Sequence, residues 1–130
     1  MNKMACETCK IQYDPNSIYC KGCPDLAKTT EGLKADNGKP PITLLHRDFV
    51  EGTALAMAYG AQKYAEHNWC KGIKYRRLID AAMRHLIAIN DGEDIDPESG
   101  LPHRYHACAS LNMLCGMTVL HPELDDRYKP

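Results

Sequence analysis

The sequence predicts an all-α domain preceded by a small cysteine-rich module. Three runs of apolar residues at helical spacing support the all-α assignment, and no segment alternates with period two long enough to form a central strand. Four of the seven cysteines cluster near the N-terminus, which indicates the separate module. Between them, residues 27–41 are rich in Thr, Gly, Asn and Pro and read as a linker arm. We therefore expect three segments, at 1–26, 27–41 and 42–130.

Each helix is predicted from its periodicity and its end signals. The first begins near residues 44–47 and ends before Asn68, and its apolar face comprises Val50, Ala54, Met57, Ala61 and Tyr64. The second begins near Tyr75 and ends at Asn90-Asp91-Gly92, and its apolar stripe comprises Leu78, Ile79, Ala82, Met83, Leu86 and Ile89. The third begins at Leu101-Pro102 and ends before Pro122, and its apolar face comprises Cys108, Leu111, Leu114, Cys115 and Thr118.

Charge and hydropathy exclude several classes of protein. Sixteen basic and seventeen acidic residues give a formal net charge of -1, which does not favour a nucleic-acid partner. The apolar stretches are short and interrupted by charges, so we expect no membrane span. The first residues contain no apolar run of the kind that a signal peptide needs. The sequence therefore predicts a cytoplasmic protein.

The clustered cysteines predict a structural zinc site. Cys6 and Cys9 form one CxxC pair, and Cys20 and Cys23 form a second. Tetrahedral zinc needs four soft donors, and each CxxC turn presents two thiolates to one ion. A redox pair or an incidental cysteine-rich tail would be the alternatives. About twenty residues without a core need such a metal to stay ordered, so its expected role is structural.

Polar residues beside the apolar stripes are candidate functional groups. Glu51 flanks the stripe of the first helix, where a solvated glutamate is the simpler interpretation. His85 lies at the edge of the second stripe, where a hydrogen-bonded core histidine is more common than a ligand. Spacing alone therefore does not assign either residue to chemistry.

The densest feature is an acidic loop followed by two histidines. Residues 91–100 contain five carboxylates, which repel one another unless they are solvated or share a cation. The glycine and the final glutamate of an EF-hand are absent from the expected positions. His103 and His106 follow, one helical turn apart. This combination suits Mg²⁺, Mn²⁺ or a transition metal, whereas a solvated turn and helix cap is the alternative.

Three separated motifs resemble one known family over about residues 38–120. The first comprises Lys39-Pro40 and Leu44-Leu45; the second comprises Gly60-Ala61-Gln62-Lys63-Tyr64, Asn68-Trp69 and Gly72. The third comprises Arg84-His85-Leu86, the stretch from Gly92 to His103, and His106-Ala107. Together they resemble the phage dATP/dGTP diphosphohydrolases, which are related to the MazG-like all-α nucleotide pyrophosphatases. The resemblance implies a MazG-like helical bundle completed by oligomerisation.

The same resemblance implies an activity and a set of site residues. The reaction would be the hydrolysis of dATP or dGTP to the monophosphate and pyrophosphate with Mg²⁺ or Mn²⁺, in phage nucleotide metabolism linked to 2-aminoadenine DNA. The catalytic candidates are Glu51, His85, Asp96 and His103. The metal-ligand candidates are Glu51, Glu93, Asp94, Asp96 and His106. The substrate-binding candidates are Lys39, Lys63, Tyr64, Asn68, Trp69 and Arg84.

Two other functions remain open at this point. The chain could be a zinc-ribbon adaptor, or a nucleotide-binding protein without turnover, whose helical part mediates assembly. It could also be an enzyme of the same fold that cleaves another nucleotide, because nothing in the spacing identifies the base. The acidic loop beside His103 and His106 favours an enzyme, since an adaptor has no use for clustered acids and imidazoles.

The size of the helical part predicts a homo-oligomer, either a dimer or a tetramer. Three helices of about 15 to 20 residues enclose a thin core, and burial shared between subunits would complete it. Sedimentation at micromolar concentration is expected to give a mass above the 14.6 kDa of one chain. A monomer at that concentration would contradict this prediction.

Overall fold

The computed structural model describes residues 4–5, 12–13 and 34–130. It divides into two units, residues 1–41 and residues 42–130. In the first unit, strands β1 (Met4–Ala5) and β2 (Gln12–Tyr13) pair in antiparallel fashion, with Met4 opposite Tyr13. The four cysteines of the predicted zinc site lie outside the described residues, so that site stays a prediction.

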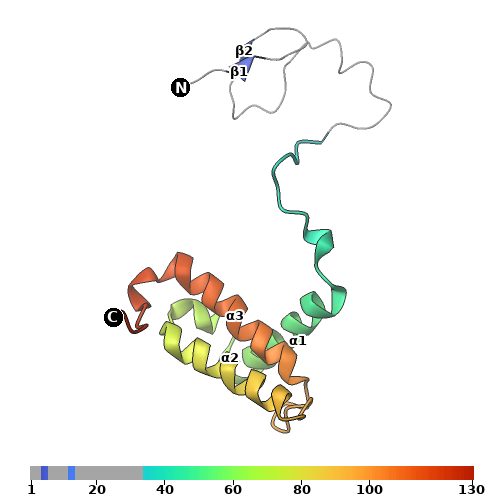
Figure 1. The fold of residues 1–130 in the computed structure, drawn as a ribbon, viewed down its shortest axis with the longest axis vertical. Helices are drawn as coiled ribbons and strands as arrows, with labels where there is room; N and C mark the ends of the chain where they lie inside the picture. Colours follow the sequence, from blue (N-terminus) through green and yellow to red (C-terminus); the bar gives the residue numbers. More distant parts are fainter. Residues whose placement is uncertain (1–3, 6–11, 14–33) are drawn as a thin grey trace. The chain divides into compact units, whose positions relative to one another are not determined.

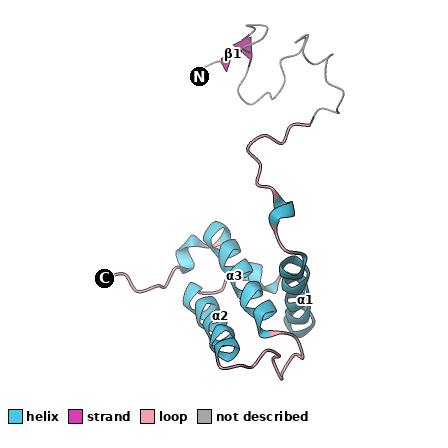
Figure 2. Ribbon diagram, turned by 45° about the vertical axis from the view of Figure 1, so that its right-hand side comes forward, coloured by secondary structure: helices cyan, strands magenta, loops and turns pink. Residues whose placement is uncertain are grey.

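The second unit is helical, which confirms the all-α prediction. Its three long helices are α1 (Arg47–Tyr64), α2 (Tyr75–Asn90) and α3 (His103–Leu120). Short 3-10 turns lie at η2 (Ile42–Leu44), η3 (Asn68–Lys71) and η4 (Pro122–Leu124). Helices α2 and α3 lie within two residues of their predicted limits, and α1 begins at the predicted place but ends three residues before residue 67. Helix α3 packs against both α1 and α2 (Figures 1 and 2).

The core lies at the C-terminal end of α3, against the start of α2. Tyr75, Leu78 and Met117 are buried there, and Met117 is completely covered. The partly buried residues around them are Trp69, Ile73, Ile79, Met113, Leu114 and Leu124. The hydroxyl of Tyr75 donates to the Met117 carbonyl at 3.3 Å, so the two helices are joined by polar as well as apolar contacts.

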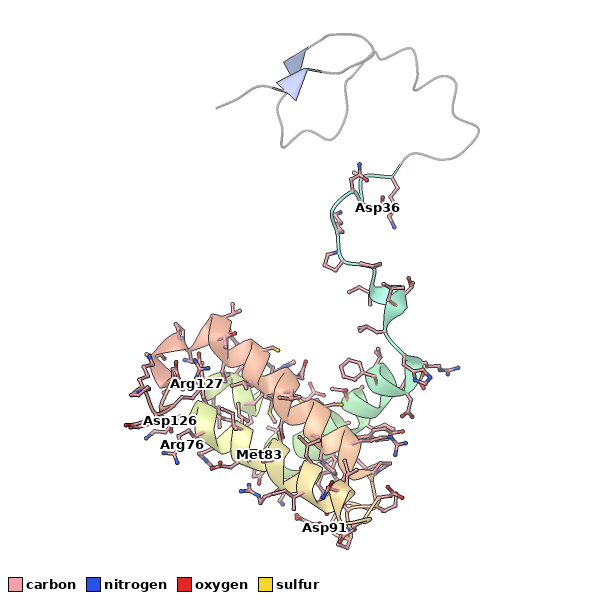
Figure 3. The ribbon with its side chains drawn as sticks, viewed as in Figure 1. Asp36, Arg76, Met83, Asp91, Asp126 and Arg127 are labelled. Carbon is pink, nitrogen blue, oxygen red and sulfur yellow. The ribbon has the colours of Figure 1, made fainter. Side chains whose placement is uncertain are left out.

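The C-terminal tail returns to the start of α2. The Arg76 amide donates to the Asp126 carboxylate at 2.9 Å, and the Arg127 guanidinium lies 5.6 Å from the centre of the Tyr75 ring (Figure 3). His121 adds a link to η3, with its Nε2 atom 2.8 Å from the Cys70 carbonyl oxygen. These contacts hold η3 and the α2 start in place, and both form part of the site described below.

Small residues allow α1 to approach α3 closely. Gly52 and Ala56 are the buried residues of α1, and a Cβ atom at Gly52 would lie 2.2 Å from ring carbons of Tyr105. The hydroxyl of Tyr105 donates to Asp48, and Arg104 donates to the same carboxylate at 3.2 Å. The flat side of the Tyr105 ring therefore occupies the space that a side chain at position 52 would need.

The apolar faces predicted for α1 and α3 are not the faces that these helices bury. Val50 and Tyr64 are exposed, at 47% and 65%, while α1 buries Gly52 and Ala56 instead. On α3, Leu111 and Cys115 are exposed, and the helix buries His103, Ala107, Ala109, Ser110 and Met117. Helix α2 follows its prediction at Leu78 and Ala82, but Met83 and Leu86 are about half exposed (Figure 3 labels Met83). Close packing of small residues determines which face of each helix is buried. A pattern of hydrophobic residues alone does not reveal that packing.

None of the helices in the described part of the chain is long and apolar enough to cross a bilayer.

We predict that Gly52→Ala destabilises the helical unit. The added methyl group would displace the Tyr105 ring and weaken its hydrogen bond to Asp48. Overpacking of this kind costs about 1–3 kcal/mol in the free energy of unfolding, which urea denaturation measures. Gly60→Ala on the same helix is the matched control, because a Cβ there meets nothing within 4 Å. Equal stability of the two variants would show that the Gly52–Tyr105 contact is unimportant.

Candidate functional site

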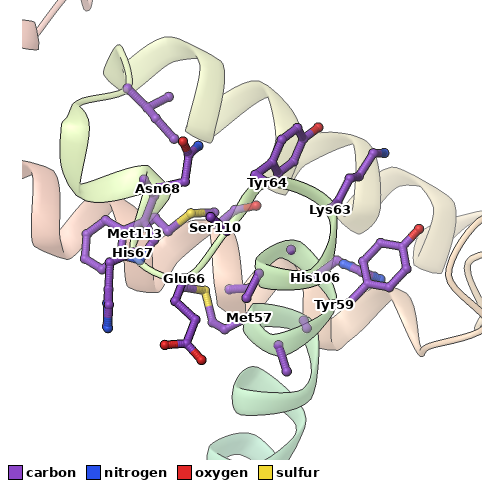
Figure 4. Close-up of a pocket in the computed structure, with 18 of the residues that line it drawn as sticks. Met57, Tyr59, Lys63, Tyr64, Glu66, His67, Asn68, His106, Ser110 and Met113 are labelled. Carbon is purple, nitrogen blue, oxygen red and sulfur yellow. The ribbon is translucent and has the colours of Figure 1, made fainter.

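A cavity of about 990 Å³ lies between the C-terminal half of α1, the η3 segment, and the facing sides of α2 and α3. Its volume is at the upper end of the range of about 300–1,000 Å³ that is typical of small-molecule sites. Figure 4 shows Tyr59, Lys63 and His106 toward one end and Asn68 and Met113 toward the other. His85, Asp96 and Glu98 also line the cavity.

Three histidines gather where α2 and α3 meet beside this cavity. The rings of His85 and His106 are stacked, with centroids 4.9 Å apart and planes 17° from parallel. The ring of His103 lies 5.2 Å from that of His85 and is buried. The edge of Tyr59 on α1 contacts His106, with ring centroids 5.9 Å apart. Residues from all three helices therefore meet at this group.

A hydrogen-bonded chain runs from Glu93 through His103 to His85. The Nε2 atom of His103 lies 3.0 Å from the Glu93 carboxylate, and its Nδ1 atom lies 2.9 Å from Nδ1 of His85. A carboxylate without a proton only accepts hydrogen bonds, so the His103 tautomer that fits both contacts carries its proton on Nε2 and accepts at Nδ1. His85 then donates from Nδ1. Its Nε2 atom consequently keeps a free lone pair.

A second chain links Asp96, Ser99 and His106. The Ser99 hydroxyl lies 2.7 Å from the Asp96 carboxylate and 2.6 Å from Nε2 of His106. It also accepts a bond from the Leu101 amide at 3.2 Å. Because the hydroxyl has one hydrogen and the carboxylate can only accept, that hydrogen goes to Asp96. His106 therefore donates from Nε2 and keeps the lone pair on Nδ1.

The electrostatic environment favours the neutral form of both stacked imidazoles. Burial lowers the pKa of His85, and the neighbouring His106 and His103 lower it further. Burial also lowers the pKa of His106 more than the nearby Asp96 carboxylate raises it. For Asp96, burial raises the pKa, but hydrogen bonds from Ser99 and from the Glu98 and Ser99 amides bring it below its ordinary value. An ionised Asp96 thus lies beside neutral imidazoles.

The acidic loop folds tightly enough to hold these side chains. Asp96 accepts hydrogen bonds from the Glu98 and Ser99 amides in a local turn of the kind that Asp residues favour. The Asp96 amide donates to the Leu101 carbonyl at 2.9 Å, and the Gly100 amide donates to the Asp96 carbonyl at 2.8 Å. Gly100 has a φ of 72°, a value that glycine adopts without strain. The loop is therefore a folded part of the site.

Lys63 of α1 reaches this loop at the edge of the cavity. Its Nζ atom lies 2.7 Å from the Glu98 carboxylate, and this bond raises the pKa of Lys63. Both side chains remain about half exposed, so the pair adds little stability. Its importance is its position, because it places an ammonium group at the same end of the cavity as His106.

The described residues were also considered as ligands for Mg²⁺ or Mn²⁺. No three His, Cys, Asp or Glu side chains among them are arranged around one ion position. Mg²⁺ often uses only one or two protein carboxylates together with substrate phosphates. Asp96 and Glu98 line the cavity, and the one bond to Asp96 Oδ1, from the Glu98 amide, is long at 3.3 Å. These two carboxylates suit an ion that arrives with a phosphate ligand.

The structure brings together many of the residues that the sequence singled out. The cavity is lined by His85, Asp96, His106, Lys63, Tyr64, Asn68 and Trp69. His103 and Glu93 lie outside this lining: His103 contacts His85, and Glu93 contacts His103. Trp69 packs against Gly116, where a Cβ would lie 2.4 Å from its ring, so part of its surface is used in the core.

Other predicted residues lie elsewhere. Glu51 is exposed, pairs with Arg47 at 2.8 Å, and is outside the cavity lining, as are Asp94 and Arg84. Lys39 belongs to the first unit. The roles predicted for these four residues therefore remain predictions.

Sequence reasoning missed several residues of the site. Ser99, which joins Asp96 to His106, could have been found from the Asp-x-x-Ser spacing of the loop turn. The lining residues that were not site candidates include Met57, Tyr59, Glu66, His67, Lys71, Arg77, Glu98, Ser110 and Met113. Nothing in their local spacing signals a cavity, because the cavity forms only when three helices pack.

The chain is similar to known dATP/dGTP diphosphohydrolases. The family model described as dATP/dGTP diphosphohydrolase, N-terminal, matches residues 29–127, a range that begins after the cysteine cluster. A protein from Salmonella phage PMBT28, named dATP/dGTP diphosphohydrolase, is 40% identical over 96 residues. The match covers 74% of this chain but 33% of the relative, so the chain spans about one third of the relative's length. No solved structure matches. By the extent of the family match, the chain belongs to the dATP/dGTP diphosphohydrolase family, in the part described as N-terminal.

Proposed function

We propose that this chain hydrolyses dATP or dGTP to the deoxynucleoside monophosphate and pyrophosphate in the cavity between its three helices. One observation carries the proposal: a lysine, an ionised aspartate and two neutral imidazoles line a single cavity in a member of this family. Polyphosphate hydrolysis needs cationic groups for the phosphates and a base for the attacking water. The phage origin of the relative favours a role in phage nucleotide metabolism. The link to 2-aminoadenine DNA rests on the family resemblance alone and stays a prediction.

In this proposal His85 is the general base. Water adds to the α-phosphorus, the bond from that phosphorus to the α–β bridging oxygen breaks, and pyrophosphate leaves. The water proton passes to Nε2 of His85, which the bond to His103 leaves free. Glu93 and buried His103 act as positioning residues, since they fix the tautomer and the ring orientation of His85.

The proposal includes a divalent cation, Mg²⁺ or Mn²⁺. When bound, it would neutralise phosphate charge and withdraw electrons from the phosphorus. Asp96 and Glu98 would hold it from the cavity side, while the roles of Glu51, Glu93, Asp94 and His106 as ligands stay predictions. Lys63 would exchange Glu98 for a phosphate oxygen, since both are anionic partners for the same ammonium group.

We also propose that the helical unit assembles into a homo-oligomer. Apolar side chains about half exposed or more occur on all three helices. They include Phe49, Val50 and Leu55 on α1, Met83, Leu86 and Ile87 on α2, and Leu111 and Val119 on α3. Exposed apolar surface of this kind is typical of protein interfaces.

The N-terminal cysteines carry a separate proposal, a structural zinc site. We expect the purified full chain to contain about one zinc ion per molecule by elemental analysis, because four thiolates complete a tetrahedral site. Replacing Cys9 and Cys20 with serine should remove that zinc. Zinc-free protein as purified, with free thiols, would contradict the proposal.

Product analysis tests the proposed reaction. The full chain, incubated with each dNTP and NTP and with Mg²⁺ or Mn²⁺, is expected to release monophosphate and pyrophosphate from dATP or dGTP. Chromatography separates these products from diphosphate and inorganic phosphate. Binding of a nucleotide without turnover under either metal would instead support a binding protein or an adaptor.

Variants then locate the reaction within the molecule. Asp96→Ala should reduce turnover at least about 100-fold, because it removes the ionised carboxylate of the cavity. Glu51→Ala tests the metal-ligand role that the family resemblance implies for a residue outside the cavity lining, and on that resemblance it should lose activity as well. Asp80→Asn, an exposed position of α2 outside the cavity lining, is the control. Turnover retained in either test variant, with an unchanged helical circular dichroism signal, removes that residue from the mechanism.

A further inference from the structure

One hydroxyl group lines the middle of the cavity without an assigned role. Ser110 is 6% exposed and lies on α3 one turn after His106 and one turn before Met113, and all three residues line the cavity. In Figure 4 its side chain lies near Met113, in the region between the His106 and Asn68 ends. Ser110 is therefore placed to contact a ligand that extends away from His106.

The Ser110 hydroxyl has no hydrogen-bond partner in the described part of the protein. Helical serines and threonines often bond to a carbonyl of the preceding turn, as Thr53 does with Phe49. Among the described side chains, no fully buried nitrogen or oxygen lacks a partner. Ser110 makes no such bond, so its hydroxyl oxygen must keep some solvent-accessible surface. Because the residue is otherwise buried and lines the cavity, we infer that this oxygen faces the cavity.

The cavity that this hydroxyl lines also contains apolar side chains. Met57 of α1 and Met113 of α3 line the cavity with Ser110, together with Ala56 and Ala109. Thioether groups make favourable contacts with aromatic rings, and they adapt to ring shape. A flat aromatic ligand with a polar edge would fit this region, because its faces would contact apolar side chains while its edge meets the hydroxyl.

We propose that Ser110 is a specificity-determining residue that hydrogen-bonds the exocyclic group of a purine base held beside Met57 and Met113. This inference rests on the proposed function, because the base is taken to be part of a nucleoside triphosphate with its phosphates near Lys63 and Asp96. A hydroxyl can donate one hydrogen bond and accept two. It can therefore accept from the amino group of adenine or donate to the carbonyl of guanine.

This dual capacity distinguishes Ser110 from a fixed donor or a fixed acceptor. A backbone amide could bond guanine but not the adenine amino group, and a carbonyl would do the reverse. A rotating hydroxyl accepts both purines at one position. The printed name of the phage relative, a dATP/dGTP diphosphohydrolase, contains that same pair of substrates.

The test compares Ser110→Ala with the unmodified full chain on three substrates. These are dATP, dGTP and the triphosphate of 2′-deoxypurine riboside, whose base has no exocyclic group. We expect Ser110→Ala to lower kcat/KM about three- to tenfold for dATP and dGTP, as the loss of one neutral hydrogen bond would. The value for the deoxypurine substrate should stay within about twofold, since it makes no such bond.

Two controls separate this result from damage to the fold. Thr118→Ala removes a hydroxyl from the same helix outside the cavity lining, and that hydroxyl bonds only to the Cys115 carbonyl. It should leave all three values unchanged. Ser110→Cys keeps the size of the side chain but weakens the hydrogen bond, and should therefore give the same substrate pattern as Ser110→Ala.

The outcomes distinguish the inference from the function on which it rests. Equal losses on all three substrates, or no loss on any, would overturn the role of Ser110 while leaving the hydrolysis intact. Absence of turnover by the unmodified chain would overturn the proposed function, and the inference with it. A loss confined to dATP and dGTP would support both.

Discussion

The hydrogen bond between His85 and His103 is the contact on which the candidate site depends. It joins α2 to α3 at the end opposite the Tyr75–Met117 contact, so the two helices are fixed relative to one another at both ends. His103 is buried, and its hydrogen bond to Glu93 favours the tautomer with the proton on Nε2. One polar chain thus sets both the packing of the helices and the chemistry of the His85 ring, because the same bonds that join the helices fix the tautomer.

Local signals predicted the helices well and their packing faces poorly. Pro102 and the Asn90-Asp91-Gly92 stretch mark helix ends by their own backbone preferences, without reference to the rest of the chain. Which face is buried depends on the partner helix. Gly52 is buried because Tyr105 lies against it, and no property of residues 47–64 alone indicates that contact.

Some residues of the candidate site could also be predicted from the sequence, whereas others could not. Asp96 and His106 were identified because the acidic loop and the histidines after it are conspicuous in sequence, whereas His85 was identified through the family resemblance. The α2–α3 turn brings all three to one cavity. Ser99 and Ser110 are ordinary residues whose proposed roles come from their positions. Ser99 lies between a carboxylate and an imidazole, and Ser110 lines the cavity together with two methionines. Glu51 shows the opposite situation, since it is conspicuous in sequence yet lies outside the cavity beside Arg47.

The charge of the cavity supports the proposal that a metal ion accompanies the substrate. Its lining contains three cationic side chains, Lys63, Lys71 and Arg77, and three carboxylates, Glu66, Asp96 and Glu98. The stacked imidazoles add little charge, because burial favours their neutral form. A nucleoside triphosphate carries several negative charges, so the three carboxylates of the cavity would repel it when no metal ion is bound. A divalent cation on the phosphates offsets part of that repulsion, because the same carboxylates can bind the ion. The acids of the loop are therefore better suited to a metal-bound nucleotide than to the nucleotide alone.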